Sequence, residues 1–192
     1  MKKVIILGAS GNIARHVIDL LAKKEDINLT LFLRNKSRLR NKDISKCRII
    51  EGNVLDFKQL KDAILEQDIV YANLAGELEA MAKNIVKAMN EAGVKKLIFI
   101  SSIGIYNVPL RSVLNPYRKA ADVIEASDLD YTILRPTWFT NEDEIDYEIA
   151  RKGEPEKGSV ISQKSLATFI TKIIDHPEMY IHENLSINKP NS

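Results

Sequence analysis

Apolar residues along the chain fall into two alternating patterns. Short runs that are apolar at nearly every position predict buried strands, because a strand covered on both faces shows no polar alternation. These runs lie at residues 4–8, 29–33, 47–52, 68–76, 96–102, 130–136 and 184–188. Between them, apolar residues recur every three or four positions. This spacing predicts helices at about 12–23 and 57–67, over a long segment ended by Gly93, and at about 117–127 and 162–175.

Strands that alternate with helices are typical of a parallel, doubly wound sheet. The sequence therefore predicts an α/β fold with three layers, α/β/α. No internal repeat, low-complexity tract or linker interrupts the alternation, so residues 1–192 are interpreted as a single domain. The helix and strand after residue 136 are interpreted as a small C-terminal extension, and the acidic stretch 141–148 as a solvated loop or helix start at the rim of a cleft.

Composition narrows the class of protein. Hydrophobic residues make up 45% of the chain and charged residues 28%, which excludes wholesale disorder. No apolar run approaches the roughly 20 residues of a membrane span, and the N-terminus has no room for a signal peptide. The single cysteine, Cys47, cannot form an internal disulfide and fits a reducing cytosol, so a cytoplasmic protein is expected. The three histidines are scattered, and no metal site is predicted.

A glycine pair stands at the first junction between strand and helix. Residues 5–21 read IILGASGNIARHVIDLL, in which Gly8 and Gly11 are followed by the small residue Ala14. In the dinucleotide fingerprint, the first glycine makes the turn and the second lets a pyrophosphate approach the backbone. The small third residue lets helix and strand pack closely, and the helix presents its N–H groups to the phosphates. The stretch therefore predicts a bound dinucleotide.

Five motifs stand in the order seen in the atypical short-chain dehydrogenases/reductases. They read GASGNIA (8–14), GNVLD (52–56), NLAG (73–76), FISSIGIY (99–106) and LDYTILRPTWF (129–139). The sequence most resembles the small NAD(P)H-binding, NmrA-like branch, which also includes flavin reductases similar to biliverdin reductase B. The resemblance covers nearly the whole chain and implies a Rossmann-like fold, but it does not single out a substrate.

The resemblance implies a role for each residue that matches a motif. It places the pyrophosphate beside Gly8, Ser10, Gly11, Asn12 and Ile13. It places the adenine beside Asn53 and Val54, the ribose above Leu74, Ala75 and Gly76, and the nicotinamide beside Pro136 and Thr137. The family usually has Asp where Asn53 stands. Asn53 could instead cap a turn, Leu74 could be a core residue, and Asp56 is interpreted as the N-cap of a helix with Gln59 as its reciprocal partner.

A basic segment follows the second predicted strand. It contains one acid, Asp43, and seven basic residues: Arg34, Lys36, Arg38, Arg40, Lys42, Lys46 and Arg48. A solvated loop explains most of the later charges. Nucleic-acid binding is not expected, since neither interleaved aromatic residues nor a recognition helix accompanies the patch. Arg34 stands where an NAD-preferring fold would place an acid, so it is predicted to clamp the 2′-phosphate of NADP(H), with Ser37 or Arg38 as a further contact.

The catalytic residues depart from the family pattern. In the larger family, a Tyr-x-x-x-Lys pair donates the proton and a serine orients the carbonyl. Ser102 stands in the place of that serine, and Tyr117 supplies the tyrosine, but Ala121 occupies the lysine position. Lys119 points to another side of the helix and cannot substitute directly. Tyr106 is a second phenol that could equally be a core residue.

Two classes of function fit this sequence. The first is an NADPH-dependent reductase that passes hydride to a flavin, a quinone-like compound or another conjugated acceptor, with solvent as the proton source and Ser102 orienting the acceptor. The second is a non-catalytic NADP(H)-binding sensor of the NmrA type. Either protein would bind a dinucleotide, and the reductase also a small-molecule acceptor. Neither is expected to bind a membrane, and the chain is expected to be a monomer or a dimer.

Overall fold

The large sheet organises the molecule. The computed structural model describes residues 1–192 and contains an eight-stranded sheet and a two-stranded sheet. In spatial order the large sheet consists of β3 (Arg48–Glu51), β2 (Ile27–Leu33), β1 (Lys2–Leu7), β4 (Ile69–Ala72), β5 (Lys96–Ile100), β6 (Asp130–Pro136), β10 (Glu183–Asn188) and β8 (Glu148–Arg151). All neighbours are parallel except β8, which runs antiparallel to β10. The predicted doubly wound α/β fold is confirmed.

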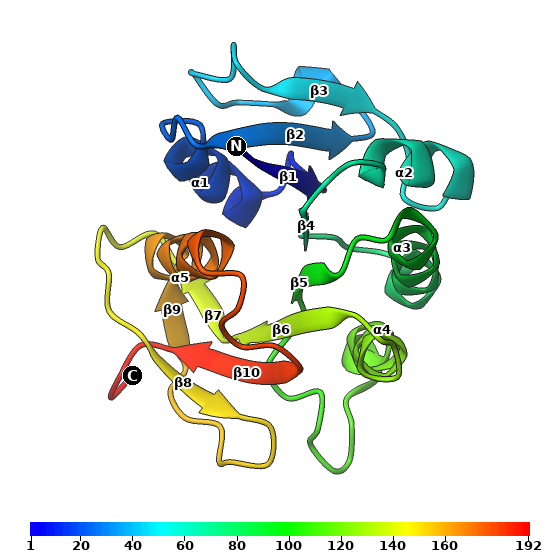
Figure 1. The fold of residues 1–192 in the computed structure, drawn as a ribbon. Helices are drawn as coiled ribbons and strands as arrows, with labels where there is room; N and C mark the ends of the chain where they lie inside the picture. Colours follow the sequence, from blue (N-terminus) through cyan, green and yellow to red (C-terminus); the bar gives the residue numbers. More distant parts are fainter.

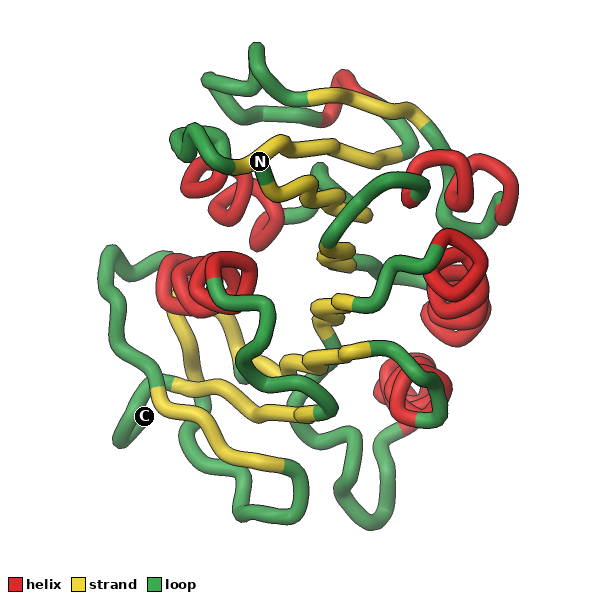
Figure 2. Tube along the Cα trace, viewed as in Figure 1, coloured by secondary structure: helices red, strands yellow, loops and turns green.

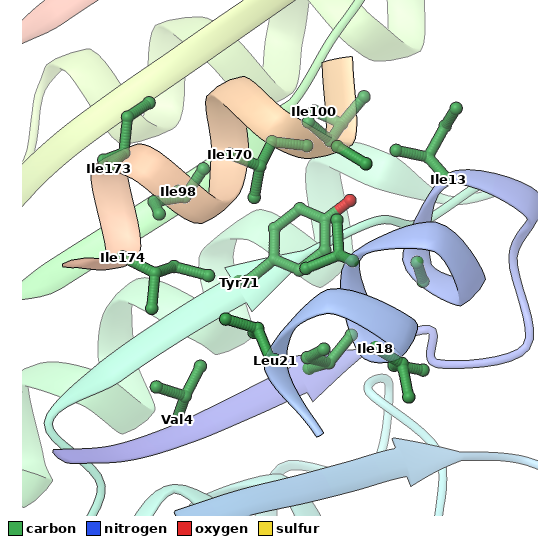
Figure 3. Packing of buried hydrophobic residues seen from close by; sticks show 14 of the residues in the cluster. Val4, Ile13, Ile18, Leu21, Tyr71, Ile98, Ile100, Ile170, Ile173 and Ile174 are labelled. Atoms are coloured by element: carbon green, nitrogen blue, oxygen red, sulfur yellow. The ribbon is translucent and has the colours of Figure 1, made fainter. Parts of the chain in front are cut away.

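Helices cover both faces of this sheet (Figure 1; Figure 2). On one face lie α1 (Asn12–Leu21) and α5 (Gln163–Asp175); on the other lie α2 (Phe57–Ile64), α3 (Leu78–Ala92) and α4 (Asn115–Glu125). Each interface holds a hydrophobic cluster, of 26 and 24 buried residues, so neither face of the central strands meets solvent. Figure 3 shows Tyr71 of β4 between Ile170 of α5 and Leu21 of α1 in the first cluster.

Local signals set the ends of several helices as the sequence predicts. The Asp56 carboxylate accepts a hydrogen bond from Gln59 N (3.0 Å) and caps α2. The reciprocal bond is not made, because the Gln59 side chain accepts from Asn53 N (3.0 Å) instead. Gly93 ends α3 with a φ of 73°, a left-handed conformation that favours glycine. Ser162 caps α5 by accepting from Ser165 N (2.9 Å).

The C-terminal segment is integral to the main architecture. The predicted C-terminal helix and strand extend the main layers, because β10 continues the parallel sheet beside β6 and α5 packs against α1. Three short strands were not predicted: β7 (Trp138–Thr140), β8, and β9 (Val160–Ser162), which pairs in parallel with β7. Two 3-10 turns, at Lys36–Arg38 and Ser112–Leu114, complete the fold.

Within the acidic stretch, Glu144 pairs with Lys189 (2.7 Å) and Asp143 with Lys164 (2.6 Å), before β8 begins at Glu148. These pairs attach the stretch to α5 and to the C-terminal segment.

None of the helices combines the length and the apolar character needed to cross a membrane. No group of three or more His, Cys, Asp or Glu side chains is arranged to hold a metal ion.

The direction of winding changes at β1. From β1 the chain passes outward through β2 to β3, and it then returns to the other side of β1 for β4, β5 and β6. The carboxyl ends of β1 and β4 therefore diverge into connections on opposite faces. In open α/β sheets this point leaves a crevice in which ligands bind.

Candidate functional site

The turn after β1 is built from glycines that touch the end of β4. Gly8 has a φ of 81°, and a Cβ atom added there would lie 2.1 Å from the carbonyl oxygen of Asn73. A Cβ on Gly11 would lie 2.3 Å from Asn73 Nδ2. The sequence predicted close approach to a ligand at these positions. The structure shows that the close approach of Asn73, at the end of β4, also requires glycine at these two positions.

The N-terminus of α1 presents free donors to this turn. Gly11 is the N-cap, no side chain caps the helix, and its first turn carries no acid. The first backbone hydrogen bond runs from Arg15 N to Gly11 O (3.0 Å), so the preceding amides of Asn12, Ile13 and Ala14 have no helical acceptor. Three free N–H groups and the positive end of the helix dipole favour a bound anion.

A cleft of about 290 Å³ opens at the carboxyl ends of β1, β2 and β4. It brings together eight of the residues predicted to bind a cofactor: Gly8, Ser10, Gly11, Arg34, Asn53, Val54, Leu74 and Ala75. Arg38 and Asn73 line it as well. We call this space the first cleft.

Basic side chains gather beside the first cleft. Lys36 pairs with Glu51 (4.0 Å), whereas Arg34 and Arg38 line the cleft and form no ion pair. A neighbouring depression of about 370 Å³ is lined by Ser10, Gly11 and Asn12, together with Arg15, Arg38 and Arg40. Asn41 fixes the basic loop against α1, because its Nδ2 donates to Arg15 O (2.9 Å) and to Asp19 Oδ1 (2.8 Å). The loop thus places positive charge beside the free amides at the N-terminus of α1.

Three predicted binding residues differ in placement or bonding from the others in the first cleft. Ile13 is 3% exposed and belongs to the hydrophobic core, so only its backbone can face the first cleft. Gly76 lies in a separate surface depression beside Glu79 and Lys119. The Asn53 side chain accepts from Leu55 N (3.1 Å) and so caps a turn, the alternative that the sequence left open.

A larger cleft, of about 1020 Å³, adjoins the first and shares Asn73 and Leu74 with it. We call it the second cleft. It contains the remaining predicted residues, Ser102, Tyr117, Pro136 and Thr137. Its rim carries exposed apolar side chains from two segments, namely Trp138 (75% exposed), Val113 (63%) and Phe139 (47%). The space therefore suits a ligand with an extended apolar surface.

Two adjacent serines, Ser101 and Ser102, follow β5 directly and line the second cleft. Ser102 Oγ donates to the carbonyl of Ile103 (3.2 Å). Ser101 also lines the cleft, yet its Oγ is buried and has no hydrogen-bond partner in the chain. A buried hydroxyl without a partner is uncommon and indicates a polar group supplied from outside the chain. Ser101 was not predicted from the sequence, although FISSIGIY contains two adjacent serines.

The lysine expected beside Tyr117 is absent. Ala121, at the lysine position, is fully buried on the sheet side of α4. Lys119 Nζ pairs with Glu79 Oε2 (3.3 Å) on α3 and is therefore committed elsewhere. Tyr117 lines the second cleft without a neighbouring lysine.

Tyr106 is held in a polar network. Its hydroxyl donates to Glu125 Oε1 (3.1 Å) and accepts from Asn184 Nδ2 (2.7 Å). Burial, together with the charge and hydrogen bond of Glu125, raises the pKa of Tyr106 above its ordinary value. A phenol with a raised pKa that already donates to a carboxylate is a poor proton donor at neutral pH. Tyr106 supports the wall of the second cleft.

Comparison with known proteins assigns the chain to a family. Residues 8–177 match the family described as NAD(P)H-binding. The chain belongs to this NAD(P)H-binding family. Its residues also fit a dinucleotide, since the glycine turn and the free amides of α1 offer a cradle for phosphates and Ser101 offers an unpaired hydroxyl farther along. The family resemblance seen in the sequence motifs is confirmed.

Solved structures agree with this assignment. A Rossmann-fold NAD(P)-binding family protein from Shigella flexneri is 50% identical, with a TM-score of 0.94 over 100% of this chain and 95% of that one. A short-chain dehydrogenase/reductase from Veillonella parvula, crystallised with NADP, is 26% identical, with a TM-score of 0.91 over 99% and 95% of the two chains. An isoflavone reductase homologue from Nicotiana tabacum is 25% identical over 98% of this chain, which spans 68% of the tobacco protein.

Proposed function

We propose that the protein is an NADPH-dependent reductase of a small conjugated acceptor, such as a flavin or a quinone-like compound. The observation that carries this proposal is the junction of the two clefts at Asn73 and Leu74. A dinucleotide laid along the first cleft, with its phosphates at α1, would extend past this junction toward Pro136 and Thr137. The second cleft then remains open for the acceptor.

The chain's own residues hold and orient the two reactants. The glycine turn and the amides of Asn12 and Ile13 bind the pyrophosphate, and Pro136 and Thr137 flank the nicotinamide. The reduced nicotinamide, when bound, supplies a hydride. Ser102 donates a hydrogen bond to the acceptor, for which its hydroxyl must turn away from the Ile103 carbonyl. The apolar rim excludes water from one side of the acceptor.

The proposed reaction needs no acidic side chain. A conjugated acceptor takes up the hydride as an electron pair with one hydrogen, and its electronegative atom then takes a proton from water. Loss of the hydride would convert a bound NADPH to NADP⁺, so the electrons and the hydrogen would balance between the dinucleotide and the acceptor. This route is consistent with the absent lysine at residue 121 and with the poor acidity of Tyr106.

We further propose that NADP(H) is preferred over NAD(H). Arg34 and Arg38 line the first cleft at the end of β2, and neither is neutralised by an acid of the chain. Two unpaired guanidinium groups would stabilise the extra phosphate of NADP(H) through charge-assisted hydrogen bonds. The relative from Veillonella parvula was crystallised with NADP.

A second function, a non-catalytic NADP(H) sensor, is favoured by one observation. Ala121 occupies the position of the lysine that assists proton donation in the larger family. The nearby Lys119 already forms an ion pair with Glu79 and is not available to Tyr117. A sensor would need the first cleft but no acceptor in the second.

Oxidation of NADPH in the presence of flavins, quinones and aldehydes, each tested separately, distinguishes the two functions. The reductase proposal expects turnover of at least one flavin or quinone above the rate without protein, and slow or no reduction of simple aldehydes. Tight binding of NADPH with no turnover across the panel would contradict it and favour the sensor.

A further inference from the structure

A buried arginine forms the base of the second cleft. Arg135 of β6 is 1% exposed, although it lines the cleft. Its Nε donates to the neutral amide oxygen of Asn184 (2.8 Å), and its Nη1 pairs with Glu156 Oε1. Burial lowers the pKa of Arg135 below its ordinary value. The guanidinium remains charged at neutral pH, so this position requires an anion.

The Glu156 carboxylate occupies a small site for a carboxylate. One oxygen pairs with Arg135, and the other accepts a hydrogen bond from Gly104 N (3.1 Å), in the segment that follows β5. A guanidinium and a backbone N–H together form the kind of donor set that binds carboxylate ligands. The site therefore has two fixed donors, and the acid that fills it comes from another part of the chain.

Glu156 reaches this site from a loop that otherwise faces solvent. Residues 152–159 connect β8 to β9, and every residue of this connection except Glu156 is exposed. Both ends of the loop are fixed, because Lys152 Nζ pairs with Glu125 (2.6 Å) and Ser159 O accepts from Trp138 N (3.2 Å). Between these ends, Glu156 makes the only hydrogen bond and the only ion pair of residues 155–158. By contrast, Arg135 and Gly104 belong to the wall of the cleft.

The distribution of charge in the second cleft depends on this loop. Four charged residues line the cleft: Arg111, Arg135, Glu154 and Glu156. Both acids lie on the 152–159 loop, whereas both arginines lie on the main body. Arg111 is exposed at the rim and forms no ion pair. If the loop moves away, the cleft has two positive charges and an apolar rim.

We propose that Glu156 occupies the place of an acceptor's carboxylate, and that the acceptor is a planar, largely apolar molecule bearing such a group. The acceptor's carboxylate replaces Glu156 at Arg135 and Gly104, while its rings lie against Trp138 and Phe139. Displacement alone would leave buried Arg135 with no carboxylate in direct contact, since Glu125 is linked to it only through Asn184, and this is unfavourable. Opening of the loop is therefore coupled to the arrival of an anion. This inference rests on the proposed role of the second cleft as the acceptor site.

The test compares two ligands of nearly equal shape, β-naphthoate and its neutral amide. Their dissociation constants are measured by calorimetry on the full chain, with and without saturating NADP⁺. The variant Glu156→Gln keeps an oxygen for Gly104 N but removes the competing charge. Glu154→Gln is the matched control for the general effect of charge, because Glu154 lines the same cleft but forms no ion pair with Arg135 and accepts only from its neighbour Arg151 N (2.6 Å).

Glu156→Gln should bind naphthoate about tenfold to a hundredfold more tightly than the wild type, the range expected for a charge-assisted contact released from competition. Its affinity for the amide should stay within about twofold. Glu154→Gln, which removes an exposed charge from the cleft without freeing Arg135, should tighten naphthoate binding by less than about threefold. An equal gain for both ligands, or no gain for naphthoate, would overturn the proposal.

Glu156→Ala provides a second variant that also frees Arg135, and circular dichroism verifies the fold of each. Loss of the folded state in both variants would overturn the proposal too, since a group that leaves on binding cannot be one that the fold requires. Binding of naphthoate does not depend on turnover. A failed reductase assay and a failed displacement test are therefore separate results.

Discussion

At the end of β2, Arg34 lines the first cleft next to the place where folds of this kind hold the adenosine ribose. A bidentate contact between a guanidinium and a phosphate contributes about 1.5–3 kcal/mol. Arg34→Ala should therefore weaken NADPH binding about ten- to a hundredfold and leave NADH binding nearly unchanged. Dissociation constants for both dinucleotides, measured at low and high salt, provide the test, and the NADPH effect should shrink at high salt.

Lys36→Ala is the control for this experiment. Lys36 lies on the same segment, but it pairs with Glu51 and does not line the first cleft. Its removal should leave both constants within about twofold. Equal losses for NADPH and NADH in Arg34→Ala would indicate that Arg34 stacks on the adenine. A wild-type preference for NADH would exclude the clamp altogether.

Substitutions of Ser102 and Tyr117, both in the second cleft, test whether the reaction depends on positioning of the acceptor or on proton donation by a side chain. Ser102→Ala should lower kcat by about ten- to a thousandfold, the scale of losing one oriented hydrogen-bond donor. NADPH affinity should change little, because Ser102 lines only the second cleft. Tyr117→Phe should cost less than about threefold in kcat, since no lysine is available to activate the phenol.

Steady-state kinetics with the best acceptor of the panel measure both effects, and the exposed Ser112→Ala serves as the control. Unchanged turnover in Ser102→Ala would remove this serine from the reaction. A large loss in Tyr117→Phe would mean that another cation assists the phenol, and the interpretation of the missing lysine would be wrong.

Among the elements, the turn between β1 and α1 offers a test of why two glycines are needed. Gly11 has an ordinary φ of −70°, so alanine is conformationally allowed there, and the obstacle is the Asn73 side chain 2.3 Å from the added Cβ. Gly11→Ala should therefore lower the free energy of unfolding by about 1–3 kcal/mol, the usual cost of overpacking. Adding Asn73→Ala should recover much of this loss in denaturant unfolding experiments.

Gly8 provides the contrast, because its obstacle is the backbone carbonyl of Asn73 at 2.1 Å and its φ is 81°. Asn73→Ala cannot relieve either problem, so Gly8→Ala should stay as destabilising in the double variant. If Asn73→Ala restores the unfolding free energy in both alanine variants, or in neither, the contact with the Asn73 side chain does not explain why residue 11 is a glycine.

The elements also show which features a sequence can reveal. Strands β1 and β6 and helices α1 and α5 were predicted within a few residues, since each carries a continuous apolar run or a strong helical period. The strands β7, β8 and β9 have only three or four residues each, and most of these are half-buried or exposed, so no pattern marks them. They are defined by pairing with distant segments, as β8 is with β10.

The same reasoning applies to the site. The positions of the glycine turn and of Arg34 at the first cleft were predictable, because each follows the end of a strand directly. Their roles toward a cofactor stay predictions. The carboxylate site at Arg135 was not, because its partners Gly104, Glu156 and Asn184 come from three separate connections or strands. Nothing in their spacing along the chain relates them. Only the assembled sheet brings them to one wall of the second cleft.

At the scale of the whole molecule, the carboxyl edge of the sheet carries the two clefts, and the opposite edge carries a buried cation. Lys96, at the start of β5, is 5% exposed. Its Nζ donates to Thr132 Oγ1 of β6 (3.0 Å) and to Met179 O, in the turn after α5 (3.0 Å). It thus links two strands to the last connection of the fold. Burial lowers the pKa of Lys96 to about 8, against the opposing effects of Asp130 and Glu178.

This lowered pKa predicts how global stability varies with pH. Between about pH 8 and pH 10, the unfolded chain keeps the Lys96 proton, because a free lysine has a pKa of about 10.4, whereas the folded protein loses it. The unfolded state binds more protons in this window, so the contribution of Lys96 to the free energy of unfolding rises with pH. Lys96→Met, which preserves much of the side-chain volume, should remove this contribution.

Urea unfolding at half-unit steps of pH, for the wild type and Lys96→Met, gives the comparison directly. The difference in unfolding free energy, wild type minus variant, should be constant below about pH 7 and should increase from about pH 8 to pH 10. Titration of the tyrosines and the other lysines is common to both proteins and cancels in this difference. A difference that stays flat across the window would mean that Lys96 keeps an ordinary pKa, and that water reaches it between the strand ends and the turn after α5.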